Sequence, residues 1–458
     1  MSPAPATTAT SDRLQAWLET YASWPADRDG SDPNAGTDAH PAVRELRRRG
    51  LEAFTRLGFP TTRDEEWRFT NLAPLLATDY HYPSPVACVT EPEEVGTFSY
   101  LDAHQLVFLN GRFCPEYSTL FELPEGVTVT SLEEALATRP EQVLAHLGGY
   151  VRMEDQAFAA LNTAHLRDGA FVSIGEGEVL TQPLHLLFLS TGSREPAMSW
   201  PRNLIVMGAN SQATLIESYA GGSHRPYLTG AVSEIVVGDY AVLEHYKVQQ
   251  EGLKGWHMAT SHFRLGRSTT VTSQNISLGG GFVRNDTVAE LMGEGGDLTL
   301  NGLYLTRGTQ FVDNHMRVEH VAPNCHSYEL YKGILEEKSR AVFSGLIHVH
   351  PGAQKTDGVQ ANRNLILSPE ALVNTNPQLL IFADDVKCTH GSTVGQLDKD
   401  ALFYLRSRGI GEDAARSLLI YAFASEFVEK IRFEPLRKDL EEFLFTRLPK
   451  GDIVRQAV

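Results

Sequence analysis

The stretch FADDVKCTHGSTVGQLDKDALFYLRSRG, residues 382–409, lies where a strand-rich region gives way to a helical one. Its second half has the pattern of a capped helix, because Asp398 precedes KDALFYLRSR and Gly409 follows it. In its first half, Cys388 and His390 are two residues apart, so a strand would direct both side chains to one face. The pair is a candidate soft-metal site, and the alternative is a buried cysteine beside a hydrogen-bonded histidine. Two ligands do not complete a zinc or iron site, so others would have to come from elsewhere in the fold or from another chain.

Upstream of this stretch, the chain carries an internal repeat. An apolar residue followed by glycine recurs at spacings of 33, 30, 28 and 27 residues, at Gly175, Gly208, Gly238, Gly266 and Gly293. Weaker matches with another residue in place of glycine follow 43 and 32 residues later, at Glu336 and Ser368. A period near 30 residues without a helical pattern between the turns favours a strand solenoid, or β-helix. The alternative is a β-sandwich, which places turns about every 8 to 12 residues without a longer register.

These patterns divide the chain into four parts. We expect residues 1–97 to form an N-terminal helical region with a disordered start, and residues 98–168 to form a mixed α/β lead-in. Residues 169–395 would form the β-helix core, and residues 396–458 a C-terminal helical domain. The predicted fold class is therefore mainly β, a strand solenoid flanked by α-helical regions at both ends.

Local signals support this division. In the N-terminal region, Pro41 stands at a first helical position and Gly58 follows the last turn of the same pattern. In the lead-in, Asn110-Gly111 between two apolar runs predicts a tight hairpin. After the core, apolar residues at helical spacing predict two further helices, over residues 412–432 and 436–448.

Composition excludes several classes of protein. The 458-residue chain has a formal net charge of −17, which argues against a nucleic-acid binder because such proteins need a basic face. Hydrophobic residues make up 42% and charged residues 21%, values that allow a sizeable globular core. No run approaches about eighteen apolar residues, and the start lacks the basic and apolar regions of a signal peptide. We therefore expect a cytoplasmic protein without a membrane segment.

Other histidine clusters in the sequence invite a metal-site interpretation. A first cluster lies within twelve residues, at His315, His320, Cys325 and His326. Its spacing matches no common zinc pattern, so structural roles are favoured. His348 and His350 would share one face of a strand, and for this pair a polar outer face is the favoured interpretation.

The motifs of several enzyme classes are absent from the sequence. It contains neither a GxxxxGK[ST] phosphate loop nor a GxSxG elbow. Asp384 and Asp385 could serve a glycosidase, but adjacent carboxylates on a strand point to opposite faces and cannot flank one bond. A stand-alone β-helix enzyme that acts on a carbohydrate is therefore a weaker alternative.

Four separated segments, in order along the chain, resemble one family. They are TRDEEWRFTNL near residue 62, ELYKGILEEKSRAVFSGLIHV from Glu329, PGAQKTDGVQANRNLILSP from Pro351 and KCTHGSTVGQLDKDALFYLRSRGI from Lys387. Together they resemble the SufB/SufD family of iron-sulfur cluster assembly proteins, densely in the middle and C-terminus and more sparsely at the N-terminus. The resemblance implies a right-handed parallel β-helix with a C-terminal helical domain, in a SufBCD complex with SufB and the ATPase SufC.

The resemblance also implies roles for particular residues. In SufD-type chains, a histidine in a Cys-Ser-His-Gly segment faces SufB and is implicated in cluster formation. Here the segment reads Cys388-Thr389-His390-Gly391, so the role falls on His390, and Cys388 has a weaker claim to ligation. The helices after Asp398 would dock SufC, an expectation that includes Phe403, Tyr404, Arg406, Arg408 and Gly409.

One departure separates the two branches of the family. SufB-type chains place a cysteine in the segment that matches residues 361–365 and a glutamate after the histidine, whereas this chain has no cysteine there and Gly391 after His390. The SufD branch is therefore favoured. The resemblance then implies a non-catalytic subunit whose iron-sulfur cluster is transient and shared with SufB, none being bound by the isolated chain. A SufB-like scaffold that binds a cluster alone is the alternative, and the sequence leaves the stoichiometry and a homodimer without the partner open.

Overall fold

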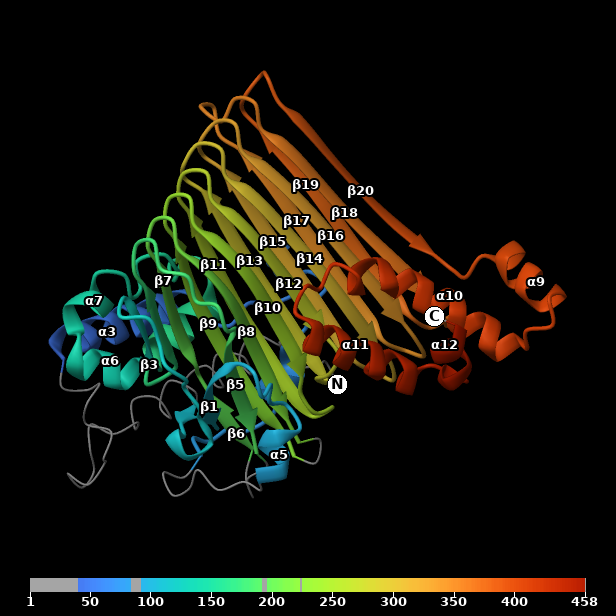
Figure 1. Ribbon diagram of the computed structural model, residues 1–458, viewed down its shortest axis with the longest axis horizontal. Helices are drawn as coiled ribbons and strands as arrows, with labels where there is room; N and C mark the ends of the chain where they lie inside the picture. Colours follow the sequence, from blue (N-terminus) through green and yellow to red (C-terminus); the bar gives the residue numbers. More distant parts are fainter. Residues whose placement is uncertain (1–39, 84–91, 192–195, 223–224, 458) are drawn as a thin grey trace, which may run out of the picture.

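The fold is known from a computed structural model, which describes residues 40–83, 92–191, 196–222 and 225–457. The predicted disordered start lies outside these residues. Parallel strands stack into two sheets that alternate along the chain and form a strand solenoid with helices at both ends, as Figure 1 shows. The predicted fold class is thus confirmed. The β-sandwich alternative is wrong because, apart from the antiparallel pairs β1–β2 and β3–β4, neighbouring strands in each sheet come from successive turns and run parallel.

The two sheets divide the strands between them. Sheet A contains β3 (Val127–Ser131), β4 (Ala170–Ile174), β6 (Ala197–Ser199), β7 (Arg202–Met207), β9 (Tyr227–Val237), β11 (Gly255–Leu265), β13 (Phe282–Leu291), β15 (Phe311–His320), β17 (Arg340–Val349) and β19 (Leu372–Ile381). Sheet B contains β1 (His104–Leu109), β2 (Arg112–Phe113), β5 (Leu184–Ser190), β8 (Gln212–Gly221), β10 (Val242–Gln250), β12 (Thr270–Ser277), β14 (Asp297–Thr306), β16 (His326–Leu335), β18 (Asp357–Ile366) and β20 (Lys387–Gly395). Side chains that point inward from both sheets fill the space between them with an apolar core.

The repeated glycines mark the corner where the chain leaves sheet A. The Gly208 amide donates to the Ile174 carbonyl at 2.7 Å, and the Gly238 amide donates to the Met207 carbonyl at 2.9 Å. A Cβ atom on Gly238 would lie 2.8 Å from the backbone of Gly208, so successive corners stack closely only where the side chain is absent. The repeat predicted from the sequence is therefore a ladder of stacked corners.

The two weaker matches of the predicted repeat do not lie at the same corner as the glycines, so this part of the prediction was wrong. Glu336 and Ser368 come after β16 and β18, so they lie at the opposite corner, where the chain leaves sheet B. The residues in phase with the glycine ladder are Val321, His350 and Phe382, whose amides donate to carbonyls of the preceding sheet A strand. Sequence pattern missed them because the later corners carry side chains instead of glycine.

Helices cover the N-terminal end of the solenoid and part of the outer face of sheet A. They are α3 (Pro41–Leu57), the 3-10 turn η1 (Glu65–Trp67), α4 (Ala73–Leu76), α5 (Pro92–Gly96), the 3-10 turn η2 (Pro115–Tyr117), α6 (Leu132–Thr138), α7 (Pro140–Leu144) and α8 (Ala157–Ala164). Pro41 begins α3 and Gly58, at φ 66°, ends it, as predicted. The Asn110-Gly111 hairpin joins β1 to β2 with positive φ at both residues. Apolar side chains of these helices pack with outward-facing residues of sheet A, including Leu228, Met258 and Phe282.

The C-terminal helices pack on the outer face of sheet B. They are α9 (Lys399–Ser407), α10 (Glu412–Val428), α11 (Glu434–Arg447) and α12 (Gly451–Ala457). The helix predicted over residues 412–432 ends at Val428, because the Tyr246 hydroxyl accepts hydrogen bonds from the amides of Arg432 and Phe433 and holds the chain in a turn. Buried residues of α10 and α11 form one cluster with side chains from β8 to β18 of sheet B. This packing leaves the C-terminal end of the solenoid uncovered (Figure 1).

Candidate functional site

The last turn of the solenoid carries the two residues singled out from the sequence. Cys388 and His390 lie on β20, which pairs with β18 along one edge. The Cys388 side chain is half-buried and packs with Ile347 and Val349, and burial raises the pKa of its thiol. His390 is exposed and makes no hydrogen bond to any residue that the structure describes. The structure therefore brings both residues to the open end of the solenoid, and their ligation of a metal stays a prediction.

The side chain of His390 continues a column that runs along the inside of sheet B. His390 is in register with Gln360 of β18, which is in register with Glu329 of β16. The Gln360 amide nitrogen donates to the Glu329 carboxyl at 2.6 Å, and both residues are almost fully buried. Burial raises the pKa of Glu329 to about 8, so its carboxyl group is mainly neutral at pH 7. A buried polar column thus ends at an exposed imidazole.

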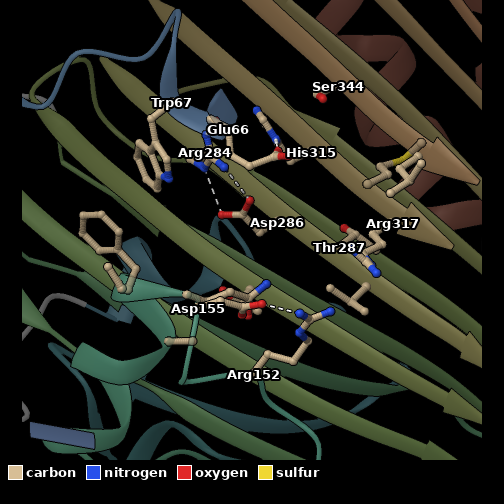
Figure 2. Close-up of a pocket in the computed structure, with 18 of the residues that line it drawn as sticks. Glu66, Trp67, Arg152, Asp155, Arg284, Asp286, Thr287, His315, Arg317 and Ser344 are labelled. Carbon is tan, nitrogen blue, oxygen red and sulfur yellow. Dashed lines mark hydrogen bonds and ion pairs between the residues drawn. The ribbon is translucent and has the colours of Figure 1, made fainter. Parts of the chain in front are cut away.

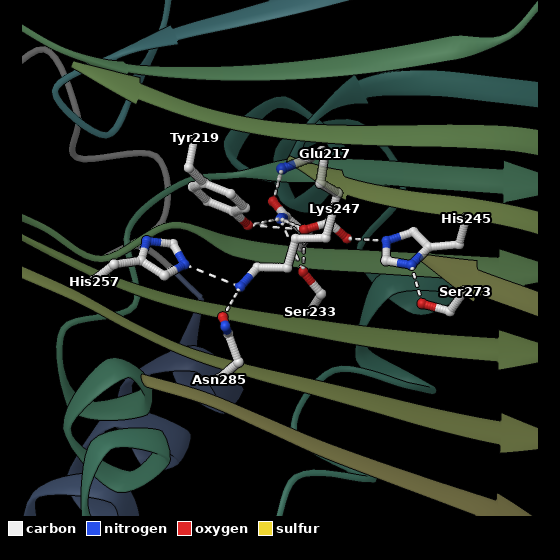
Figure 3. Close-up of polar contacts among 10 residues, drawn as sticks. Glu217, Tyr219, Ser233, His245, Lys247, His257, Ser273 and Asn285 are labelled. Carbon is white, nitrogen blue, oxygen red and sulfur yellow. Dashed lines mark hydrogen bonds and ion pairs between the residues drawn. The ribbon is translucent and has the colours of Figure 1, made fainter. Parts of the chain in front are cut away.

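A second polar network fills the solenoid interior further back, as Figure 3 shows. The Glu217 carboxylate accepts hydrogen bonds from Tyr219 and Ser233, each at 2.8 Å, and lies 3.3 Å from Nε2 of His245. Burial opposes its ionisation, yet the contacts with His245, Ser233 and Tyr219 lower the pKa of Glu217. The Lys247 ammonium lies 3.0 Å from Nε2 of His257, and burial lowers the pKa of Lys247 to about 8. Charged groups therefore occupy positions that a simple solenoid fills with aliphatic side chains.

This network was not predicted from the sequence, although the sequence contains a signal for it. The strands LIESYAG, LEHYKVQQ and TSQNIS place polar residues at positions that the strand period directs inward. In the structure, Glu217, Lys247 and Asn275 are register partners on β8, β10 and β12. Aligning successive repeats by strand phase would have shown the polar column.

The TRDEEWRFTNL segment lies against the outer face of sheet A, beside a cavity of about 240 Å³. Figure 2 shows the Arg284 guanidinium beside Trp67 and paired with Asp286. The guanidinium carbon lies 3.8 Å from the Trp67 ring centroid, and the ion pair with Asp286 measures 2.8 Å. His315 lies 3.0 Å from the Glu66 carboxylate and 2.9 Å from that of Asp313. These contacts attach the N-terminal region to the solenoid, so this motif has a structural role.

The histidines near residue 320 do not gather into one cluster. His315 takes part in the ion pairs described above, whereas His320 contacts the Ser327 hydroxyl at 2.9 Å in the interior. Cys325 is buried and its thiol contacts the Gly293 carbonyl, and His326 is exposed. These separate positions agree with the prediction that the four residues have structural roles and do not form one metal site.

The residues expected to dock SufC lie on or just after α9, which stands apart from the solenoid in Figure 1. No residue of α9 is buried, and Phe403 and Tyr404 are 74% and 56% exposed. The Arg408 guanidinium donates to the Tyr404 hydroxyl at 3.0 Å, and Arg406 forms an exposed ion pair with Glu412. Gly409 ends the helix at φ 89°. The structure leaves this aromatic surface uncovered.

Comparison with known proteins agrees with the architecture. Residues 188–423 match the model for the SUF system FeS cluster assembly SufBD core domain, and residues 34–186 match the SufBD protein N-terminal region. A β-solenoid with an open last turn and helical regions at both ends is thus the architecture of an iron-sulfur cluster assembly protein. The chain belongs to the SufBD family.

Individual relatives support the same family. An iron-sulfur cluster assembly SufBD family protein of Synechocystis is 37% identical, over 85% of this chain and 88% of the relative. The iron-sulfur cluster assembly protein SufD of Escherichia coli is 33% identical, over 96% of this chain and 98% of the relative. The protein of the same name in Bacillus subtilis is 25% identical, over 87% and 92%. The similarity to SufD proteins therefore extends over most of the chain.

None of the helices within the described residues has the length and apolar character needed to cross a membrane.

Proposed function

We propose that this chain is a non-catalytic, SufD-type subunit of a cytoplasmic SufBCD complex, in which it pairs with SufB and binds the ATPase SufC. The observation that carries the proposal is the uncovered last turn, where β20 is exposed at all but one position and β19 has only exposed and half-buried residues. In a middle strand such as β11, nearly every residue is buried. The end of a solenoid needs a cover to protect its strand edges and apolar side chains. We assign that cover to SufB.

The chemistry of the open end fits a partner that adds strands to it. β19 and β20 each pair along one edge, so their other edges offer backbone donors and acceptors. Large apolar side chains are exposed in the same turn, at Leu372, Leu380, Ile381, Phe382 and Val394. An interface that buries them would gain free energy from the hydrophobic effect. Docking there would also enclose Cys388 and His390.

Enclosure would make His390 a ligand in a shared site. Imidazole binds iron beside thiolate ligands, and this turn offers one imidazole and one thiol, too few for a cluster. The missing ligands would come from SufB, so the cluster is a transient product that the isolated chain does not hold. The raised pKa of Cys388 opposes formation of its thiolate, which agrees with a weaker claim to ligation.

The binding of SufC is assigned to the C-terminal helices. α9 presents exposed Phe403 and Tyr404 on a helix that makes few contacts with the rest of the chain. Because aromatic and arginine side chains dominate many interfaces, this surface suits a protein partner. The sequence contains no phosphate loop of its own, which agrees with ATPase activity in the partner.

Anaerobic reconstitution with iron and sulfide tests the proposal. We expect the purified chain alone to acquire no cluster, measured as acid-labile sulfide and visible absorption, and the chain with SufB and SufC to acquire one. A stable cluster on the chain alone would instead support a SufB-like scaffold, and hydrolysis of a sugar polymer would support the enzyme alternative. Leu380→Lys, at a leucine that is 41% exposed, should prevent pairing with SufB, while Leu253→Lys, at a leucine in a distant turn that is 53% exposed, should not.

A further inference from the structure

Three potential metal ligands meet on the outer face of sheet A near the open end. They are the Glu319 carboxylate of β15 and the imidazoles of His348 and His350, at the end of β17 and just after it. Glu319 is in register with His348, and His350 lies two residues further on the same face. One ligand atom from each residue lies within 4.8 Å of the other two. Strand alternation in the sequence predicted that the two histidines share one face. Only the register between β15 and β17 shows that the Glu319 carboxylate lies beside them.

Both imidazoles approach one carboxylate oxygen. His350 Nε2 lies 2.7 Å from Oε2 of Glu319, and His348 Nδ1 lies 2.6 Å from the same atom. His348 Nδ1 is buried and has no aligned hydrogen bond, so its contact with the carboxylate is mainly electrostatic. The carboxylate oxygen and the two ring nitrogens therefore face one point, where a metal cation would be attracted by all three.

The surroundings hold the three ligands in place. The Arg317 guanidinium pairs with Oε1 of Glu319, which leaves Oε2 for the imidazoles. The residues that alternate with the histidines, Ile347 and Val349, are fully buried on the inner face. Side-chain exposure rises from 8% for Glu319 through 14% for His348 to 37% for His350, so the site opens to solvent on the His350 side. A metal ion could enter there and keep water on its remaining positions.

We propose that Glu319, His348 and His350 bind one divalent transition-metal ion, and that ferrous iron is the metal this ligand set fits. Two imidazoles and one carboxylate with open positions are a known ligand set for Fe(II), and Zn(II) accepts the same groups. Arg317 acts as the outer partner that orients the carboxylate. The site is separate from the cluster site, because His348 and His350 lie on the outer face of β17 and Cys388 packs behind its inner face.

A matched control lies on the same sheet face. His262 lies 3.4 Å from the Glu290 carboxylate, which also pairs with Arg264. Glu290 is in register with Glu319 on the neighbouring strand, so the two sites share a carboxylate, an arginine and a histidine. The second imidazole is the difference. The His262 site should therefore not hold a metal ion.

Anaerobic titration of the full chain with Fe(II), without sulfide, tests the proposal, and Co(II) absorption reports the ligand geometry. We expect one equivalent of metal per chain, with the Kd raised about 10-fold or more in His348→Gln, His350→Gln and Glu319→Gln. His262→Gln should bind as the unchanged chain does. A metal-induced rise in the thermal midpoint, present in the unchanged chain and absent in His350→Gln, would confirm binding to the folded state.

Three results would overturn the assignment: no stoichiometric binding by the unchanged chain, unchanged binding by the His348→Gln/His350→Gln double variant, or loss of binding in His262→Gln. Zn(II) bound at one equivalent with no retention of Fe(II) would overturn the choice of iron. Since no sulfide and no SufB are present, failure of this experiment leaves the proposed function untouched. Failure of cluster formation in the complex leaves this site untouched in turn.

Discussion

The middle turns and the last turn of the solenoid have the same backbone pairing but opposite surroundings. In β11, buried side chains alternate between the interior and the helices that cover sheet A, whereas β19 and β20 have no fully buried residue. Both regions place polar groups in the interior, as the Glu217 network and the Glu329 column. The middle network is closed by its own contacts, but the column ends in exposed His390. Identical strand geometry can therefore serve stability in one turn and, under the proposed function, recognition of a partner in the next.

The largest effect on stability that we expect comes from the buried polar column, through the ionisation of Glu329. Glu329 has a pKa raised to about 8 in the folded chain, above its ordinary value near 4.5. Its neutral carboxyl group therefore contributes fully to the free energy of unfolding below about pH 4.5. As the pH rises to about 8, up to roughly 5 kcal/mol of this contribution is lost. Glu329→Gln should remove this decline.

Urea unfolding of the unchanged chain and the Glu329→Gln variant between pH 5 and 9 measures the difference. The free energy of unfolding of the variant should fall less over this range. Equal slopes for the two chains would show that Glu329 ionises normally and that the column is open to water.

A matched pair of phenylalanines sharpens the comparison directly. Phe263 on β11 is 1% exposed, and Phe382 at the corner of the last turn is 56% exposed. Phe263→Ala should lower the free energy of unfolding by about 3 to 5 kcal/mol, and Phe382→Ala by less than about 1 kcal/mol. Only Phe382→Ala should weaken pairing with SufB, as measured by co-purification. A large loss of stability in Phe382→Ala would mean that the last turn is part of the core.

The attachment of the N-terminal region to sheet A should depend on pH. Burial and Arg284 favour neutral His315, but Asp313 and Glu66 raise its pKa to about 9, above an ordinary value of 6.5. Its contribution to the free energy of unfolding is fully present below about pH 6.5 and is lost as the pH rises through about 9, roughly 3 kcal/mol in all. His315→Gln should be less stable at pH 6 and similar at pH 10. Thermal midpoints at the two pH values test this, and a constant difference would contradict it.

The smallest effect on stability is expected at the C-terminal surface. Phe403 is 74% exposed on α9, so Phe403→Ser should change the free energy of unfolding by less than about 0.5 kcal/mol. The same variant should weaken the binding of SufC, measured by titration calorimetry. Ile453→Ser, at an exposed position on α12, is the control. Unchanged affinity for SufC in Phe403→Ser would refute the docking surface.

The repeat in the sequence predicted the solenoid because glycine corners are a local signal. Gly208 and Gly238 stack without side chains, and this requirement is visible in one dimension. The later corners at His350 and Phe382 carry no such signal, since their stacking depends on hydrogen bonds between turns. The predicted end of α10 was wrong for the same reason, because Tyr246, which is far away in the sequence, sets where this helix ends.

The site was predictable only where its residues are close in sequence. Cys388 and His390 are two residues apart, so strand alternation placed them on one face. Glu329 and Gln360 meet His390 through the register of three strands, and Glu319 meets His348 in the same way. That register depends on the number of residues in each turn, which varies along the repeat. Contacts between residues of different turns could therefore not be predicted from the sequence pattern.

The central claim is that His390, at the open end, serves a site shared with SufB rather than the stability of the chain. Thermal midpoint and cluster yield should be measured on the same purified His390→Ala complex, with Cys388→Ser beside it. We predict a nearly unchanged midpoint and assembly with a sharp drop in cluster yield, and a smaller drop for Cys388→Ser. If His390 were instead a buried structural residue, His390→Ala would lower the free energy of unfolding by roughly 1 to 3 kcal/mol, because the partner of the histidine would be left without a hydrogen bond. A much lower midpoint with normal cluster content per folded complex would contradict the account.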